Sequence, residues 1–177
     1  VEKASSRLSI NQRKLISEYH LNINKILRKL DHCYHKAPNY AYGISLLKKS
    51  LFYKNLNICD FIVHTLKQCC SYLNINTPII LSSEIKKDNS LKAEERVLDI
   101  NRILDSKTYV NLAGGQNLYN KKKFRDEGFN LEFIKMNKIR YNQNINNVFV
   151  PNLSIIDTIM FNTEKELLNM IHQFKII

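Results

Sequence analysis

The spacing of apolar residues changes part-way along the chain, and this change constrains the fold class more than any other feature. Over residues 9–30 and 57–73, apolar side chains recur every three or four positions, which is the period of a helix with one buried face. Beyond residue 76, short unbroken apolar runs alternate with segments of helical spacing. Such short runs are typical of strands buried in a parallel sheet. The sequence therefore predicts an α/β protein with a helical first part.

The second half predicts a repeated strand and helix order that ends in two further helices. The expected elements are strands over 78–83, 108–112 and 129–134, helices over 90–104 and 120–127 between them, and C-terminal helices over 155–161 and 163–174. Ser154 is placed to cap the first C-terminal helix, and Thr163 with Glu166 forms a capping box for the second. We therefore expect a βαβαβ unit with right-handed crossovers and a largely parallel sheet, followed by C-terminal helices.

The chain has the size and composition of one globular domain. It has 177 residues, of which 44% are hydrophobic and 24% charged, and it contains no linker rich in Gly, Pro or Ser. We expect a single domain over 1–177, with a mainly helical part over 1–76 and an α/β part over 77–177. Because the chain begins with a valine and has no tryptophan, we also expect that an N-terminal segment is missing.

The net charge and the length of the apolar runs limit which partners and which cellular compartment we expect. No apolar run approaches the roughly 18 residues that span a bilayer, so we expect a cytoplasmic protein with no membrane span. Twenty-seven Lys and Arg residues against 16 Asp and Glu give a net charge of +11, which favours anionic partners. The abundance of Asn, Ile and Lys equally fits an AT-rich genome, so the charge by itself names no partner.

Two of the four glycines stand together, at Gly114 and Gly115, where an expected strand gives way to a helix. Ligands bind beyond the carboxyl ends of parallel strands, where glycines let a ligand approach the backbone and free helix N–H groups face an anion. The alternative is that the glycines only permit a tight turn. The segment is neither a GxGxxG motif nor a phosphate loop with a following lysine.

Other polar residues of the second half have two interpretations each. Ser82 and Ser83 end the first expected strand, where hydroxyls can hold a phosphate, a sugar or a carboxylate, or can make local turn bonds. Arg96 lies three residues from Asp99 on an expected helix, where an ion pair within the helix is the common explanation. The lysine run 121–123 indicates either nucleic-acid binding or a solvated face.

The cysteines and histidines favour no metal centre. The four cysteines form no C-x-x-C pair, which suits neither a zinc site nor a disulfide framework, and we expect reduced thiols. His32, Cys33 and His35 lie close in sequence, but a zinc site needs a rigid set of three or four ligands and no second cluster accompanies them. The sequence names no cofactor.

A series of short motifs follows one another through the second half. The motifs are, in chain order, Ser82-Ser83-Glu84, Glu95-Arg96-Val97-Leu98-Asp99-Ile100, Tyr109 before Ala113-Gly114-Gly115, Tyr119, Phe124 and Gly128, Tyr141-Asn142-Gln143, and Phe149-Val150-Pro151-Asn152-Leu153-Ser154-Ile155-Ile156-Asp157. A weaker match lies upstream, at Tyr34-His35-Lys36-Ala37-Pro38-Asn39-Tyr40. This order, over roughly residues 8–162, resembles the bacterial WbqC-like protein family, and its last motif is the most specific part.

The resemblance implies a biological context and a class of reaction. Members of that family occur in gene clusters for O-antigen and other surface polysaccharides, and some are described as glycine transferases that acylate an amino sugar. The implied function is a transferase of lipopolysaccharide or other surface-polysaccharide biosynthesis, which moves a glycyl, other aminoacyl or acyl group to a nucleotide-linked or otherwise activated amino sugar. Two alternatives stay open: a non-enzymatic binding module for nucleic acid or a pathway partner, and a catalytically silent fragment.

Two departures from the family pattern bear on these alternatives. The family normally opens with a strand and then His-Gln-Pro and Pro-Trp motifs, which this chain lacks. Asn111 and Leu112 also stand where the family has a serine before its glycine turn, which leaves no hydroxyl at that position.

The resemblance also implies a set of site residues. The implied ligand-binding residues are Ser82, Ser83, Arg96, Gly114, Gly115, Tyr119, Tyr141 and Gln143, and the catalytic candidates are Asp157 and Arg96. Tyr141 and Gln143 are two apart in an extended segment, so both project to one side and can bind a sugar. Asp157 lies in the first turn of an expected helix, where it can interact with the helix dipole or act as a base.

Overall fold

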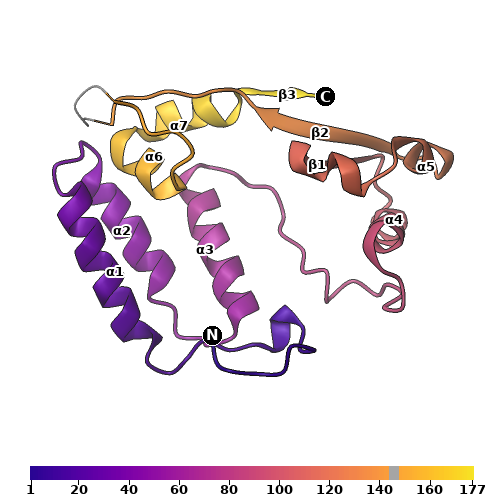
Figure 1. Cartoon of the computed structure of the whole chain (residues 1–177), viewed down its shortest axis with the longest axis horizontal. Coiled ribbons are helices and arrows are strands. Elements are labelled where there is room, and N and C mark those ends of the chain that lie inside the picture. The colour runs from indigo at the N-terminus through magenta and orange to yellow at the C-terminus, as the bar shows by residue number, and fades with distance from the viewer. Residues whose placement is uncertain (144–147) are drawn as a thin grey trace. The chain divides into compact units, whose positions relative to one another are not determined.

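The computed structural model describes residues 1–143 and 148–177, which divide into two compact units (Figure 1). The helical unit comprises Val1–Ile79 and Arg140–Met170, and the sheet unit comprises Ile80–Ile139 and Ile171–Ile177. The C-terminal helices thus belong to the same unit as the N-terminal ones. That the whole chain forms a single domain stays a prediction.

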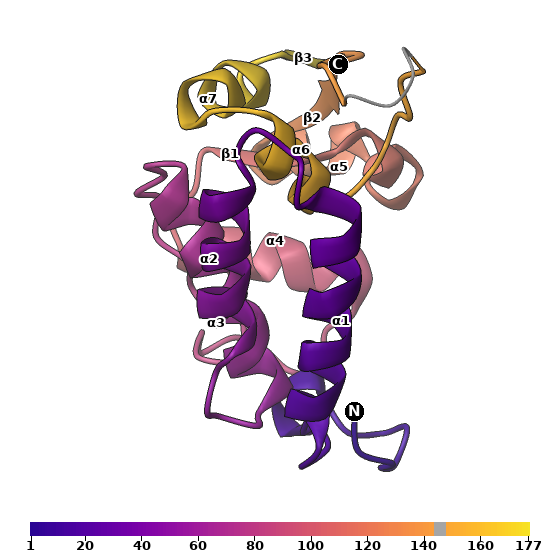
Figure 2. The ribbon, with the colours of Figure 1, turned by 90° about the vertical axis from the view of Figure 1, so that its left-hand side faces the viewer.

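The helical unit is built from five α-helices of the described residues. They are α1 (Tyr19–Tyr34), α2 (Tyr40–Leu51), α3 (Ile58–Tyr72), α6 (Ile155–Phe161) and α7 (Glu164–Ile171), preceded by a short 3-10 helix, η1 (Ile10–Gln12). Figure 2 shows α1 and α2 running side by side, and the two helices are in contact. Ile23 and Leu27 of α1 are buried, and Ile44 of α2 packs against their cluster. A second core cluster includes Leu46, Ile159 and Leu167, and it joins α2 to α6 and α7. The predicted helical first part and C-terminal helices are confirmed.

Local capping explains where several of these helices begin. The Asn57 side chain accepts hydrogen bonds from the first-turn backbone N–H groups of α3, at 2.9 and 3.3 Å. Ser154 caps α6 in the same manner by accepting from the Ile156 N–H. The Thr163 and Glu166 side chains each accept from the other's backbone N–H, so the predicted capping box is formed.

The helical spacing over 9–30 overstates the first helix, which begins at Tyr19. The preceding residues instead form an isolated antiparallel bridge between Lys14 and Asn57. Leu15 N–H donates to the Leu56 carbonyl at 2.7 Å, and Ile58 N–H donates to the Arg13 carbonyl at 3.0 Å. The segment before α1 therefore forms backbone hydrogen bonds with residues 56–58, which are distant in the sequence. A hydrophobic pattern along the chain does not reveal such partners.

The sheet unit contains a three-stranded sheet in the described residues. Its elements are α4 (Ala93–Ile103), β1 (Thr108–Leu112), the 3-10 helix η2 (Ala113–Leu118), α5 (Lys121–Asp126), β2 (Asn130–Met136) and β3 (Phe174–Ile176). The strand order is β1-β2-β3, with β1 parallel and β3 antiparallel to β2. Leu98, Phe124, Leu131 and Phe133 form the core of this unit. The mixed α/β class is confirmed, with one parallel crossover from β1 through α5 to β2.

The strand expected over 78–83 does not form, and this corrects the βαβαβ prediction. Residues 75–81 have no regular structure, residues 82–84 form a turn, and Ile80 is 57% exposed. The second neighbour of β2 is instead β3 (Phe174–Ile176), which begins at the residue where the sequence pattern ended the last helix. Strand formation depends on a distant partner, so a short apolar run cannot show by itself whether it is paired.

Gly128 ends α5 with a left-handed backbone, at φ +85°. An L-residue with a Cβ is strained in that conformation, so we expect Gly128→Ala to lower the free energy of unfolding by about 1 kcal/mol. Gly114→Ala is the matched control, because Gly114 does not have a positive φ and an added Cβ there meets no atom within 4 Å. Urea denaturation of both variants measures the difference, and equal losses of stability would contradict this account.

Candidate functional site

The most buried ionisable group of the helical unit is the carboxylate of Asp157, which is 1% exposed. Its Oδ1 accepts a hydrogen bond from the Tyr34 hydroxyl at 3.1 Å. Its Oδ2 accepts from the Tyr141 hydroxyl at 2.6 Å and from Gln143 Nε2 at 2.9 Å. A buried carboxylate is tolerated only when donors replace its water shell, and here three donors do so. We call these four residues the Asp157 cluster.

Gln143 also ties its own segment to the approach of α6. Its Nε2 donates to the Val150 carbonyl at 3.0 Å, and its Oε1 accepts from the Val150 N–H at 2.8 Å. The Gln143 side chain is only 3% exposed, so its amide needs hydrogen-bond partners within the protein. It finds them in the N–H and the carbonyl of Val150, as a backbone amide of a neighbouring strand would. This pairing holds residues 143 and 150 together and so helps to orient Tyr141 towards Asp157.

Asn39, at the start of α2, supplies a second polar link to α6. Its Nδ2 donates to the Ile159 carbonyl at 2.9 Å and to the Asn162 carbonyl at 3.0 Å, and its N–H donates to the Met160 carbonyl at 3.0 Å. Two motifs that lie far apart in the sequence, residues 34–40 and 149–157, thus meet in the helical unit.

Both tyrosines of the cluster are neutral donors at physiological pH. Burial, together with the Asp157 charge and hydrogen bond, raises the pKa of Tyr34 to about 12. Burial and the hydrogen bond to Asp157 also raise the pKa of Tyr141. Both residues are half-buried, and each hydroxyl that donates to the carboxylate keeps oxygen lone pairs that can accept a hydrogen bond from a ligand.

The structure brings together three residues that the sequence singled out. Tyr141 and Gln143 reach the same carboxylate, as their two-residue spacing predicts, and that carboxylate is Asp157. Sequence reasoning did not give Tyr34 a site role, although the weak match over 34–40 was the available signal. That these residues bind a ligand stays a prediction.

A second polar cluster lies at the carboxyl end of β1, in the sheet unit. Asn111 Nδ2 donates to the Tyr109 hydroxyl at 3.1 Å, and the Tyr109 hydroxyl donates to that of Tyr119 at 3.5 Å. Burial, and then the contact with Tyr119, raises the pKa of Tyr109 to about 12. Gly115 is buried here, and a Cβ added to it would lie only 3.0 Å from Asn111 Nδ2. We call Tyr109, Asn111, Gly115 and Tyr119 the β1-end cluster.

The backbone after β1 differs from the expected glycine turn. Residues 113–118 form η2, and neither Gly114 nor Gly115 has a positive φ. The N-terminus of α5 was expected to offer free N–H groups to an anion, but the Asn120 side chain accepts from the Lys122 and Lys123 N–H groups. A phosphate at the glycines would therefore have to bind without those two donors.

Arg96 and the two serines have local partners. Arg96 Nε donates to the Leu91 carbonyl at 2.8 Å and a terminal nitrogen donates to the Asn89 carbonyl at 3.4 Å, so the side chain holds the segment before α4. The expected ion pair with Asp99 is absent from the described residues. Ser82 and Ser83 are exposed in the turn 82–84, so they do not end a strand. Their roles as ligand contacts stay predictions.

The lysine run 121–123 is partly engaged within the sheet unit. Lys123 pairs with Glu94 at 3.2 Å and also with Glu95, and Lys121 Nζ donates to the Ile177 carbonyl at 3.2 Å. In residues 1–143 and 148–177, no three His, Cys, Asp or Glu side chains are grouped as a metal site requires. Within the same ranges, no helix is both long and apolar enough to cross a membrane.

A comparison with protein-family models places these clusters in a known family. The model of the WbqC-like protein family matches residues 1–168. The chain belongs to the WbqC-like protein family. No curated protein and no solved structure matches it. Both the Asp157 cluster and the β1-end cluster of this WbqC-like protein lie within the matched region.

We expect Tyr141→Phe to lower the free energy of unfolding by about 2 kcal/mol, because it removes a hydrogen bond to a buried charged group. The matched control is Tyr42→Phe on α2, since Tyr42 is 70% exposed. Chemical denaturation of the two variants measures the effect. A similar stability for both would show that the Tyr141 hydroxyl contributes nothing to the fold.

The raised pKa of Tyr34 predicts a loss of stability at high pH. Tyrosines of the unfolded chain ionise near pH 10, whereas the folded Tyr34 does so near 12. Its contribution is therefore complete below pH 10 and is lost as the pH rises from about 10 to 12. Tyr34→Phe should make the decline in stability over this range shallower, and Tyr42→Phe should not. Identical pH profiles for wild type and Tyr34→Phe would contradict the raised pKa.

Proposed function

We propose that this protein transfers an acyl or aminoacyl group, such as glycyl, to the amino group of an activated amino sugar in surface-polysaccharide biosynthesis. Membership of the WbqC-like family supports the context. The observation that carries the proposal is a pair of half-buried tyrosines whose hydroxyls both donate to one buried carboxylate. Such a pair can accept hydrogen bonds from the amine and a hydroxyl of a sugar.

The amine loses one proton in this reaction, and the Asp157 cluster can accept that proton. The amine nitrogen attacks the acyl carbon, a C–N bond forms, and the bond from the acyl carbon to its leaving group breaks. The amine loses a proton to the Tyr141 oxygen while the Tyr141 proton moves to Asp157, and the leaving group later takes that proton. The 2.6 Å hydrogen bond between Tyr141 and Asp157 favours this transfer, and Tyr34 orients the acceptor.

This assignment gives Asp157 a role that its burial allows. At 1% exposure the carboxylate does not reach a substrate directly, so it acts through the two phenols. Asp157 is then a positioning and proton-holding residue, and Tyr141 is the group that touches the substrate.

The sheet unit carries a separate set of proposed ligand contacts, which we consider by itself. Gly114 has open space where a Cβ would be, so a ligand can approach its backbone, and the Tyr119 hydroxyl lies on the following segment. Arg96 uses its Nε and one terminal nitrogen within the protein, so it retains further N–H donors for an anionic group. We also keep Ser82, Ser83 and Gly115 as proposed contacts.

The test is a thermal-shift screen of the chain with nucleotide-linked amino sugars, glycine, acyl-coenzyme A and short DNA, at low and moderate salt. We expect one sugar nucleotide to raise the melting temperature in both salts, because a ligand bound only by the folded state stabilises it. The same sugar is then incubated with acyl and glycyl donors, and the product is measured by mass spectrometry. Tyr141→Phe should lower kcat about 100-fold with little change in KM.

The control for that assay is Tyr42→Phe, which should keep full activity, and all variants are assayed well below their melting temperatures. A screen in which no sugar nucleotide shifts the melting temperature would contradict the proposal. A shift with DNA alone that disappears as salt rises would favour a nucleic-acid-binding module, because counterion release makes such binding strongly salt-dependent.

A further inference from the structure

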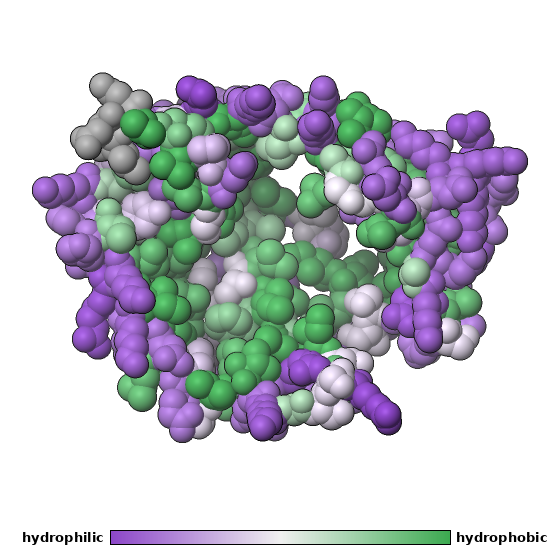
Figure 3. Space-filling model, viewed as in Figure 1, coloured by the Kyte–Doolittle hydropathy of each residue, from purple (hydrophilic) through white to green (hydrophobic). Residues whose placement is uncertain are grey.

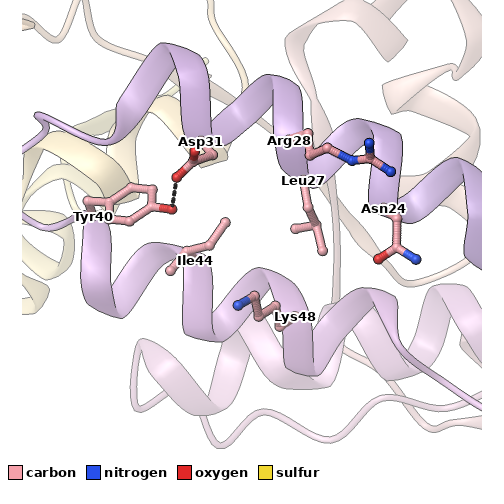
Figure 4. Close-up of a pocket in the computed structure, with 7 residues that line it drawn as sticks. All are labelled: Asn24, Leu27, Arg28, Asp31, Tyr40, Ile44 and Lys48. Atoms are coloured by element: carbon pink, nitrogen blue, oxygen red, sulfur yellow. Dashed lines mark hydrogen bonds between the residues drawn. The ribbon is translucent and has the colours of Figure 1, made fainter.

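A groove of about 360 Å³ runs between α1 and α2 of the helical unit (Figure 4). Leu27 of α1 and Ile44 of α2 line its apolar floor, and polar side chains of both helices stand around it. No residue of the Asp157 cluster or the β1-end cluster lines this groove. It is therefore a separate feature of the helical unit.

Two cations stand on opposite walls of the groove, Arg28 on α1 and Lys48 on α2 (Figure 4). Among the ion pairs of residues 1–143 and 148–177, none includes either side chain. Asn24 lies four residues before Arg28 on the same face of α1 and adds an amide N–H donor. This end of the groove thus offers positive charge and hydrogen-bond donors.

The other end of the groove has the opposite character. Asp31 of α1 accepts a hydrogen bond from the Tyr40 hydroxyl of α2 at 2.5 Å. That hydrogen bond is the main cause of the raised pKa of Tyr40, which therefore stays protonated. A ligand with an anionic end and an uncharged end that carries hydroxyl or amino groups fits this polarity, with the anion beside Arg28 and Lys48.

The groove shares α1 with Tyr34 of the Asp157 cluster. Tyr34 follows Leu27 of the groove floor by seven residues, or about two turns, so both lie on one side of α1. Arg28 precedes Tyr34 by six residues, which is about 9 Å along the helix axis and about 120° around it, so the two side chains point in different directions.

We propose that the groove between α1 and α2 binds the diphosphate of a nucleotide-linked sugar, through Arg28, Lys48 and Asn24. Guanidinium binds phosphate oxygens through two parallel N–H donors, and an ammonium adds a mobile point charge. The inference rests on the proposed function, because the diphosphate is the anionic part of the activated amino sugar that we propose as the substrate.

The test is calorimetric titration of the full chain with uridine diphosphate, and separately with inorganic pyrophosphate. The salt concentration is about 0.15 M, at which the Debye length is about 8 Å and charges further apart are largely screened. We expect Arg28→Gln and Lys48→Gln each to weaken binding about tenfold, as loss of a charge-assisted hydrogen bond does. Lys29→Gln is the matched control, because Lys29 is an exposed lysine of α1 outside the groove lining. All three variants should melt as wild type does.

Equal weakening by Lys29→Gln would overturn the inference, because the binding would then follow net charge instead of this groove. Absence of uridine diphosphate binding to the wild type would overturn it as well. The transfer assay is read separately. If Arg28→Gln still transfers the acyl group with an unchanged KM, the inference about the groove is overturned and the proposed function stands. If binding depends on the groove but no transfer is detected, the proposed function alone is overturned.

Discussion

The burial of the Asp157 carboxylate is the interaction on which the arrangement of the helical unit depends. A charge that is 1% exposed must be satisfied by protein donors, and these come from α1 and from the segment 141–143. The donors therefore hold α6 against parts of the chain that lie more than a hundred residues apart. Asn39 strengthens this link through its bonds to the α6 carbonyls.

The same interaction defines the chemistry that the helical unit can offer. Burial, together with the carboxylate that accepts from both phenols, raises the pKa of Tyr34 to about 12 and also raises the pKa of Tyr141. The carboxylate also makes the phenol oxygens better hydrogen-bond acceptors, because each O–H bond is polarised towards the carboxylate. A buried polar network of this kind is at once part of the fold and a means of handling a proton. The proposed function uses both properties without requiring the carboxylate itself to be exposed.

The two polar clusters and the groove share a physical logic. Several side chains in each of them stand on regular elements, which fix the direction in which those side chains project. In the groove, α1 and α2 set the positions of Arg28 and Lys48. At the end of β1, the alternation of the strand places Tyr109 and Asn111 on one side, where Gly115 leaves them room.

The sequence by itself determined the features that depend on near neighbours. The helix cap at Ser154 and the capping box at Thr163 follow from side chains that bond within three residues, so their local patterns were sufficient. The common orientation of Tyr141 and Gln143 likewise follows from the geometry of an extended backbone. Only the tertiary structure decided that residues 78–83 stay unpaired, that β3 joins β2, and that Tyr34 reaches Asp157. Each of these depends on which distant segment supplies the partner for a backbone or side-chain group, and no pattern along the chain contains that information.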